Sequence, residues 1–165
     1  SCPRVSPRRY GDHRGSKMSD ERGGIARIPL QISRDCVIAS IQLDLSDAIL
    51  RQFQTELLEL IQSSGARGVI LDVSGIEVMD YDDFEALHKT MAMARLMGAP
   101  SVLAGLQAGV VSSLVELGAE TDDIVAAMDL DDAFRIMDQL RATNNRHNAE
   151  DGQDERLQAA TPDQF

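Results

Sequence analysis

Two short, almost wholly aliphatic runs restrict most strongly what this chain can fold into. They are GVILDV at residues 68–73 and SVLAGL at residues 101–106. A strand with one face in water alternates apolar and polar side chains, whereas a strand covered on both faces is apolar along most of its length. The two runs therefore predict central strands of a sheet that is covered by helices.

Helical patterns lie between and after these strands. In residues 47–64, apolar side chains recur at the three- and four-residue spacing of a helix. Ser46 is a suitable N-cap for this helix, and Gly65 is a suitable C-terminal stop. Further helices are predicted from Asp80 to just before Gly98, over residues 108–118 and over residues 130–140.

Three β-rich segments complete the pattern. Residues 26–32 and 36–43 are joined by the short polar sequence SRD, which favours a hairpin, and residues 123–128 predict a last strand. The predicted order is ββαβαβαβα. This order is typical of an α/β fold with a mixed or mostly parallel sheet, because helical crossovers join parallel strands and cover the sheet.

The composition suits one globular domain. The chain has 165 residues, of which 43% are hydrophobic, so it can bury a core of useful size. Its two cysteines, Cys2 and Cys36, cannot form a disulfide framework, and Cys36 lies in an apolar run where we expect a buried free thiol. No apolar run approaches the roughly 18 residues that a membrane-spanning helix needs. We expect a soluble, cytoplasmic protein.

Both ends of the chain lack apolar periodicity. Residues 1–24 are rich in Gly, Arg, Ser and Pro, and residues 141–165 are polar, so both are predicted to be disordered. Residues 1–17 are basic, and the sequence MSDERGG that begins at Met18 is typical of a native start. We interpret 1–17 as an upstream extension; the alternative is a short basic arm that binds a partner. The folded domain is expected to cover residues 25–140.

Several function classes are disfavoured. The net charge of -11 argues against binding to nucleic acids or anionic membranes, whose phosphates would be repelled. The sequence has no glycine-rich phosphate loop and no G-x-S-x-G nucleophile motif. His88 is the single histidine in the predicted domain, too few for a zinc site or a catalytic triad, so we expect it to be a packing residue. We therefore expect neither catalysis nor a cofactor nor a metal.

The segment GIEVMDYDDFEALHKT, residues 75–90, is the remaining candidate site. Asp80, Asp82 and Asp83 flank Tyr81 at the predicted start of a helix. These carboxylates would leave the helix end in different directions without a calcium-binding loop, and no pocket pattern supports an acid/base pair. Helix capping and the helix dipole account for two or three carboxylates. They do not account for a tyrosine at a strand-to-helix junction, where loops tend to carry function.

The chain resembles a known family in three places. They are VIASIQLDL at residues 37–45, LMGA at 96–99 and GLQAGVVSSLVELGA at 105–119. With the predicted element order, these sequences resemble the STAS domain of bacterial anti-sigma factor antagonists over residues 27–140. Within that family the chain is most similar to the small single-domain scaffold proteins of the stressosome.

This resemblance implies a non-enzymatic signalling protein. In the family, a serine or threonine that follows an aspartate at the start of the second helix is phosphorylated by a partner kinase. Asp80 matches that aspartate, and Tyr81 occupies the acceptor position. A phenol places its hydroxyl several ångströms farther from the backbone than serine does, so phosphoryl transfer by a serine/threonine kinase is not expected. Asp82 and Asp83 carry negative charge where the phosphate would lie.

The resemblance also implies partners and a second modification site. The expected partners are STAS paralogues of the stressosome sensor type and a serine/threonine switch kinase or an anti-sigma factor. Ser46 matches a region that is phosphorylated in related stressosome proteins, but the sequence favours a plain helix N-cap there. Two other functions stay open at this point: a free-standing anti-sigma factor antagonist, and a small ligand-binding domain on the same fold.

Overall fold

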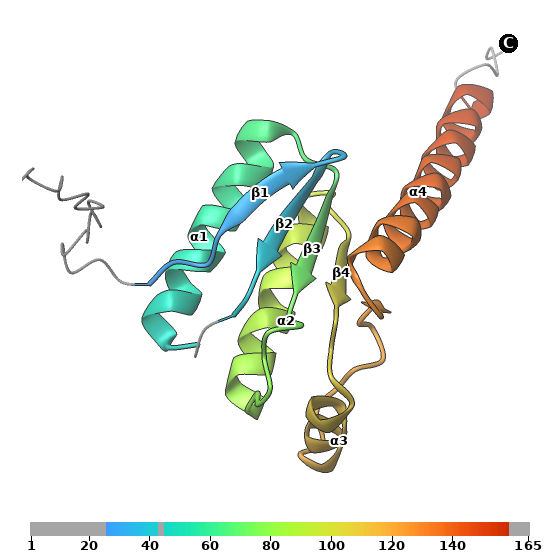
Figure 1. Ribbon diagram of the computed structural model, residues 1–165. Helices are drawn as coiled ribbons and strands as arrows, with labels where there is room; N and C mark the ends of the chain where they lie inside the picture. The colour runs from blue at the N-terminus through green and yellow to red at the C-terminus, as the bar shows by residue number, and fades with distance from the viewer. Residues whose placement is uncertain (1–25, 43–44, 159–165) are drawn as a thin grey trace, which may run out of the picture.

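The computed structural model describes residues 26–42 and 45–158, with side chains described as far as residue 146 (Figure 1). The predicted N-terminal extension, including Met18, lies outside these residues. The elements follow the predicted order. They are β1 (Leu30–Ser33), β2 (Cys36–Ser40), α1 (Asp47–Ser64), β3 (Gly68–Asp72), α2 (Tyr81–Leu96), β4 (Ser101–Ala104), α3 (Ala108–Glu116), β5 (Ala126–Ala127) and α4 (Leu130–Gln158).

The five strands form one mixed sheet in the order β1-β2-β3-β4-β5. β1 and β2 are an antiparallel hairpin, and β2 to β5 run parallel to one another. Each parallel pair is joined through a helix, the connection that parallel neighbours require. The predicted α/β class is confirmed. β5 is shorter than the strand predicted at 123–128, because only Leu103 and Ala104 of β4 pair with it.

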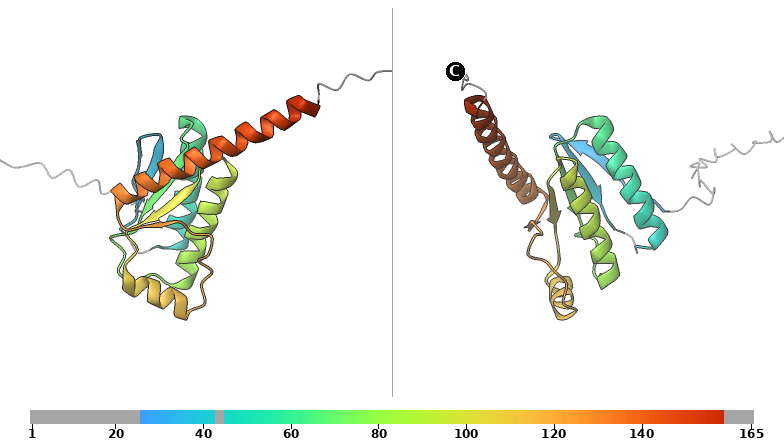
Figure 2. Two further views of the ribbon diagram at one scale, coloured as in Figure 1. Left: turned by 90° about the vertical axis from the view of Figure 1, so that its right-hand side faces the viewer. Right: turned by 180° about the vertical axis from the view of Figure 1, so that it is seen from behind.

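Helices cover both faces of the sheet, as Figure 2 shows. α1 and α2 lie on one face and α4 lies on the other. The side chains of β3 alternate accordingly: Val69 and Leu71 belong to the core cluster under α1 and α2, whereas Ile70 packs with Phe134 and Met137 of α4. The side chains of Val69, Ile70 and Leu71 are all fully buried. The aliphatic run that predicted a central strand is therefore covered on both sides.

α4 is much longer than predicted. The sequence pattern predicts a helix that ends at residue 140 and a disordered tail from residue 141, but the helix continues to Gln158. The predicted helix ends there because its apolar spacing ends there. Phe134 and Met137 are buried against the sheet, whereas the sequence after Leu140 has no apolar stripe. The later turns project beyond the sheet in Figure 2. At the start of these turns, the side chain of Arg141 still contacts the domain, at the turn between β1 and β2.

Candidate functional site

The first turn of α2 is organised by its N-cap, Asp80. This residue has an extended backbone, and its Oδ1 accepts a hydrogen bond of 2.8 Å from the backbone N–H of Asp83. A carboxylate in this position satisfies a helix donor that otherwise has no partner and lies at the positive end of the helix dipole. Asp82 and Asp83 follow in the first turn. The predicted capping role of Asp80 is confirmed.

Tyr81 is the first residue of α2 and lies at the surface, with 38% of its area exposed. Val78, in the loop that leads to the helix, is 85% exposed. Asp80 and Asp82 are exposed on either side of the tyrosine. The strand-to-helix junction therefore presents an aromatic and an aliphatic side chain among carboxylates, a combination suited to contact with a protein partner that carries basic groups.

A hollow of about 530 Å³ lies beside this junction. Its walls come from the loop between β2 and α1, which contributes Gln42 and Leu45, and from the loop between β3 and α2 with the start of that helix, which contributes Glu77, Asp80 and Asp83 among others. The hollow is open to solvent and mainly polar. The acidic cluster at the start of α2, which consists of Asp80, Asp82 and Asp83, and the loop before Ser46 consequently lie at the same end of the sheet.

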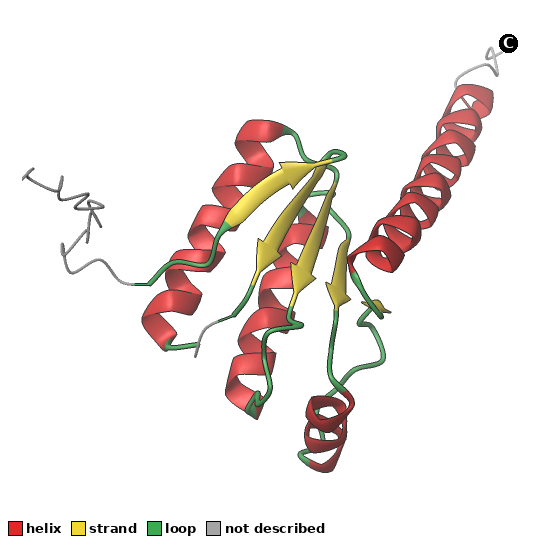
Figure 3. Cartoon of the chain, in the orientation of Figure 1, coloured by secondary structure: helices red, strands yellow, loops and turns green. Residues whose placement is uncertain are grey.

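The loop after β3 is held from two sides. The backbone N–H of Ser74 donates to Oδ1 of Asp72 at 3.0 Å, and Nε2 of Gln107 donates to the backbone oxygen of Ser74 at 3.1 Å. Gly105 has a φ of +75°, and a Cβ there would lie 2.7 Å from Cβ of Ser74. Glycine thus lets the loop before α3 approach the loop before α2. The approach places α3 at the same end of the sheet as the start of α2, as Figures 1 and 3 show.

α3 has apolar side chains on more than its buried face. Val110 and Leu114 are buried in the core, whereas Val111 and Val115 are 41% and 62% exposed. Val111 and Val115 therefore extend the apolar face of α3 beyond the part that the core covers. These valines are not among the site residues predicted from the sequence. The run AGVVSSLVE has a single charge in nine residues, and this low charge is the pattern that could have indicated an apolar surface.

Ser46 caps α1. Its Oγ accepts a 3.4 Å hydrogen bond from the backbone N–H of Ile49, and the side chain is exposed. The preceding residue, Leu45, lines the same hollow as Asp80. Ser46 and Tyr81 therefore belong to two neighbouring helix starts at one end of the sheet, and the geometry of Ser46 is that of an ordinary N-cap.

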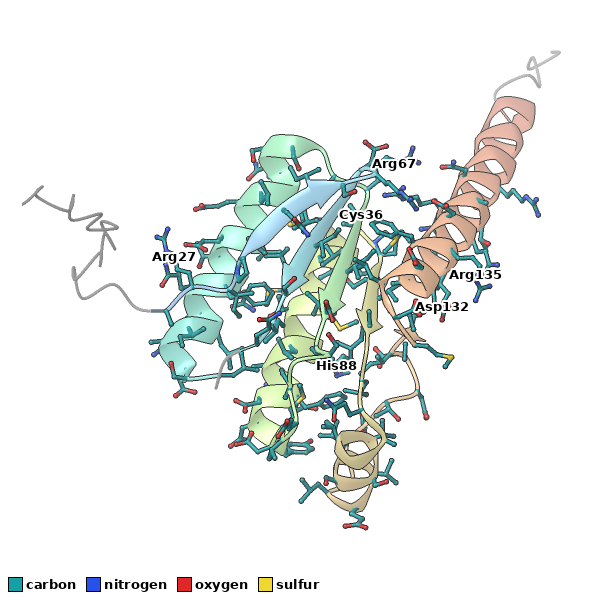
Figure 4. The ribbon with its side chains drawn as sticks, viewed as in Figure 1. Arg27, Cys36, Arg67, His88, Asp132 and Arg135 are labelled. Carbon is teal, nitrogen blue, oxygen red and sulfur yellow. The ribbon has the colours of Figure 1, made fainter. Side chains whose placement is uncertain are left out.

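The remaining chemically active groups lie elsewhere. Cys36 is a free, fully buried thiol, as predicted. Burial raises its pKa, in spite of the Arg141 guanidinium nearby, so the reactive thiolate is disfavoured. Figure 4 shows Cys36 and Arg67 near the hairpin turn, with His88 toward the opposite end of the sheet. His88 pairs with Asp123 rather than with the acidic cluster.

Within residues 26–42 and 45–158, no three His, Cys, Asp or Glu side chains are placed to hold a metal ion. In the same ranges no helix is both long and apolar enough to cross a membrane.

The fold and the exposed helix start define the class of protein. The STAS domain model matches residues 27–140, which is more than half of the chain. The protein therefore belongs to the STAS domain family, and the resemblance drawn from its sequence is confirmed.

Solved structures place the chain within this family more closely. A variant of RsbS from Moorella thermoacetica is 27% identical, with a TM-score of 0.62 over 71% of this chain and 99% of that chain. A chain in the structure of the stressosome, a signal integration and transduction hub, is 28% identical, with a TM-score of 0.61 over 68% and 98% of the two chains. No curated protein sequence matches the chain significantly.

A more distant relative shares the fold alone. The Thermotoga maritima protein assigned as an anti-sigma factor antagonist is 15% identical, with a TM-score of 0.57 over 67% of this chain and 93% of that chain. The chain is thus a STAS domain that resembles the stressosome protein RsbS and has the fold of an anti-sigma factor antagonist.

Proposed function

We propose that this protein is a non-enzymatic, cytoplasmic scaffold of a bacterial partner-switching pathway. It assembles with STAS paralogues of the stressosome sensor type and holds a serine/threonine switch kinase. The observation that carries the proposal is the match over almost the whole length of RsbS and of a stressosome chain, at 27% and 28% identity. The exposed start of α2 provides the docking surface, and the assembly itself needs no cofactor.

Tyr81 and the carboxylates beside it determine whether the docking surface can be phosphorylated. The phenol stands at the position where the family carries its phosphorylated serine or threonine, and Asp82 lies beside it with a permanent charge. A phosphate at this position would add about two negative charges to the surface. We infer that the carboxylates supply part of that charge at all times, and that the kinase does not phosphorylate the phenol of Tyr81.

Ser46 is the second position open to regulation. A phosphate there would lie at the positive end of the α1 dipole, where an anion is stabilised. It would also stand beside the hollow that Leu45 and Asp80 line, at the same end of the sheet as Tyr81. Modification of Ser46 could therefore alter the same docking surface.

A small-molecule role is the second candidate, and the hollow of about 530 Å³ beside α2 is the observation that favours it. Its size is adequate for a small ligand. A free-standing antagonist that binds an anti-sigma factor through the same surface is a third arrangement on the same fold. The three functions differ in what the purified protein binds.

Assembly measurements separate the three functions. The protein is mixed with each STAS paralogue of its organism and, separately, with each anti-sigma factor, and the particle mass is measured by light scattering after size exclusion. Its melting temperature is measured with and without small-molecule ligands. Particles of many subunits support the scaffold. A binary complex with an anti-sigma factor supports the antagonist, and failure to associate with any protein together with a ligand-induced rise in melting temperature supports the binding domain.

A further inference from the structure

The hollow beside α2 has a lining that suits a basic peptide. Three carboxylates, those of Glu77, Asp80 and Asp83, line it together with apolar side chains, of which Val78 is 85% exposed. Its volume of about 530 Å³ leaves room for several side chains of a bound segment. Carboxylates gathered in one hollow repel one another, and a cationic segment relieves that repulsion. An exposed aliphatic side chain at the rim adds apolar contact.

The chain itself contains a segment of the required charge. Residues 1–17, here called the basic arm, contain five arginines and lysines and one aspartate, which give a charge of +4. Because the whole chain carries -11, the remaining residues carry -15. The basic arm is therefore opposite in sign to the domain to which it is joined. Its sequence also includes Val5 and Tyr10, which can contact an apolar rim.

The fold brings the arm to the correct end of the sheet. The backbone N–H of Ser40, the last residue of β2, donates to the backbone oxygen of Pro29 at 3.3 Å, and two residues later Gln42 lines the hollow. Ile28 is buried in the core, so the position of the chain is fixed up to this point. Arg9, at the middle of the arm, lies 19 residues before Ile28. A random-coil linker of this length spans about 25 Å and gives an effective concentration in the mM range.

A second hollow near the start of the chain is a weaker site for the arm. It has a volume of about 300 Å³, lies beside β1 and α1, and has Glu56 and Glu59 in its wall. The carboxylate of Glu56 already pairs with Arg27 at 3.3 Å and accepts a hydrogen bond from Gln52 at 2.9 Å. This hollow is smaller, has fewer carboxylates, and has part of its charge matched by the domain itself. It serves as the comparison in the test.

We propose that the basic arm, residues 1–17, occupies the acidic hollow beside α2. The contact is intramolecular and depends on charge. Asp80 and Asp83 lie at the start of α2, so an occupied hollow covers carboxylates next to Tyr81. The arm therefore competes with the kinase for this surface, a consequence that rests on the proposed function. The docking of the arm itself does not rest on it.

A spin label on Cys2 locates the arm in the full chain. The second cysteine of the chain, Cys36, is fully buried, so a thiol-reactive nitroxide should attach to Cys2. Amide signals of residues 75–83 should lose about half of their intensity at about 50 mM salt and recover at about 500 mM. Signals of residues 56–63, beside the second hollow, should change much less. Equal or stronger broadening at residues 56–63 would overturn the proposal.

Charge variants of the labelled protein supply the controls. Replacing Arg4, Arg8 and Arg9 together by glutamine should remove the broadening near the start of α2. Glu77→Gln should reduce it, whereas Glu59→Gln, the same change in the second hollow, should not. Broadening that persists in the triple arginine variant would show that charge does not hold the arm, and would also overturn the proposal.

Kinase binding tests the competition separately. The triple arginine variant should bind the switch kinase about threefold more tightly than the native protein, because a hollow that is occupied most of the time lowers the apparent affinity. Equal affinity in the presence of a docked arm would show that the kinase uses another surface, and would overturn the competition. If the kinase binds neither protein, the proposed scaffold fails, while the spin label still decides whether the arm occupies the hollow.

Discussion

At the scale of single residues, the start of α2 combines two roles in adjacent side chains. Asp80 stabilises the helix by accepting from the N–H of Asp83, whereas Tyr81 has its ring at the surface. The carboxylate has a structural role as the N-cap of α2, whereas the tyrosine stands at the family's phosphoacceptor position. Substitutions at these two positions should therefore change different measured quantities.

Replacing Tyr81 by serine should convert the position into a phosphate acceptor. A serine hydroxyl lies close to the backbone at the exposed first position of α2, where a docked kinase can reach it, and the phenol does not present its oxygen there. Incubation with the switch kinase and ATP, followed by mass spectrometry, should detect phosphate on the Tyr81→Ser protein. Tyr81→Phe is the matched control, since it keeps the ring and removes the hydroxyl. Efficient phosphorylation of native Tyr81 would instead identify a tyrosine switch.

Replacing Asp80 by alanine should lower the free energy of unfolding by about 1 kcal/mol, the usual effect of losing an N-cap. Asp82→Asn keeps the cap and removes one charge from the helix end, so its effect should stay below about 1 kcal/mol. Urea denaturation of both variants measures the difference. Equal effects would indicate that the charge of the cluster, rather than the cap, stabilises the helix.

The ion pair of Asp123 predicts a pH dependence of stability. Because the folded protein lowers the pKa of this carboxyl, the contribution is fully present above the pKa of an unfolded aspartate and is lost as pH falls through the lower folded pKa. Asp123→Asn should therefore be less stable than the native protein at neutral pH, and the difference should vanish in strong acid. A difference that persists there would assign the effect to packing.

At the scale of elements, α4 shows what the sequence pattern could not reveal. Its first turns were predicted because apolar residues meet the sheet. The later turns were not, because Arg141 is held by polar contacts. Its guanidinium donates to the backbone oxygens of Arg34 and Asp35 at 3.1 and 2.9 Å, at the turn of the β1–β2 hairpin. Contacts between residues more than 100 positions apart leave no periodic trace in a sequence.

Two truncations test the role of Arg141. Ending the chain after Leu140 removes the guanidinium that donates hydrogen bonds to the backbone oxygens of Arg34 and Asp35. This change should lower the free energy of unfolding by about 2 kcal/mol, the range for hydrogen bonds from a charged group. Ending it after Arg146 keeps Arg141 and the contact of Arg67 with Asn145, and should leave stability nearly unchanged. Equal stability of both products would mean that the contact of α4 with the hairpin contributes nothing.

At the scale of the whole molecule, the sheet was predictable and the docking surface only partly so. The aliphatic strands and helical spacing predicted the fold, and the cap at Asp80 followed from residue type. The exposure of Val111 and the hydrogen bonds of His88 and Arg95 with Asp123 were not predictable. Both depend on the path of the connection between α3 and β5. Sequence periodicity shows which residues share a helix face, but not which neighbour covers it.

The net charge of -11 predicts opposite effects of salt on two kinds of association. Copies of this chain repel one another, so raising the salt concentration from about 50 to about 500 mM should favour self-association by screening that repulsion. Docking of a basic partner on the carboxylates around Tyr81 should weaken over the same range, mainly through a slower association rate. Light scattering measures self-association, and stopped-flow mixing with the kinase measures the rate. Kinase association that is insensitive to salt would place the kinase on a surface away from Asp80 and Asp82.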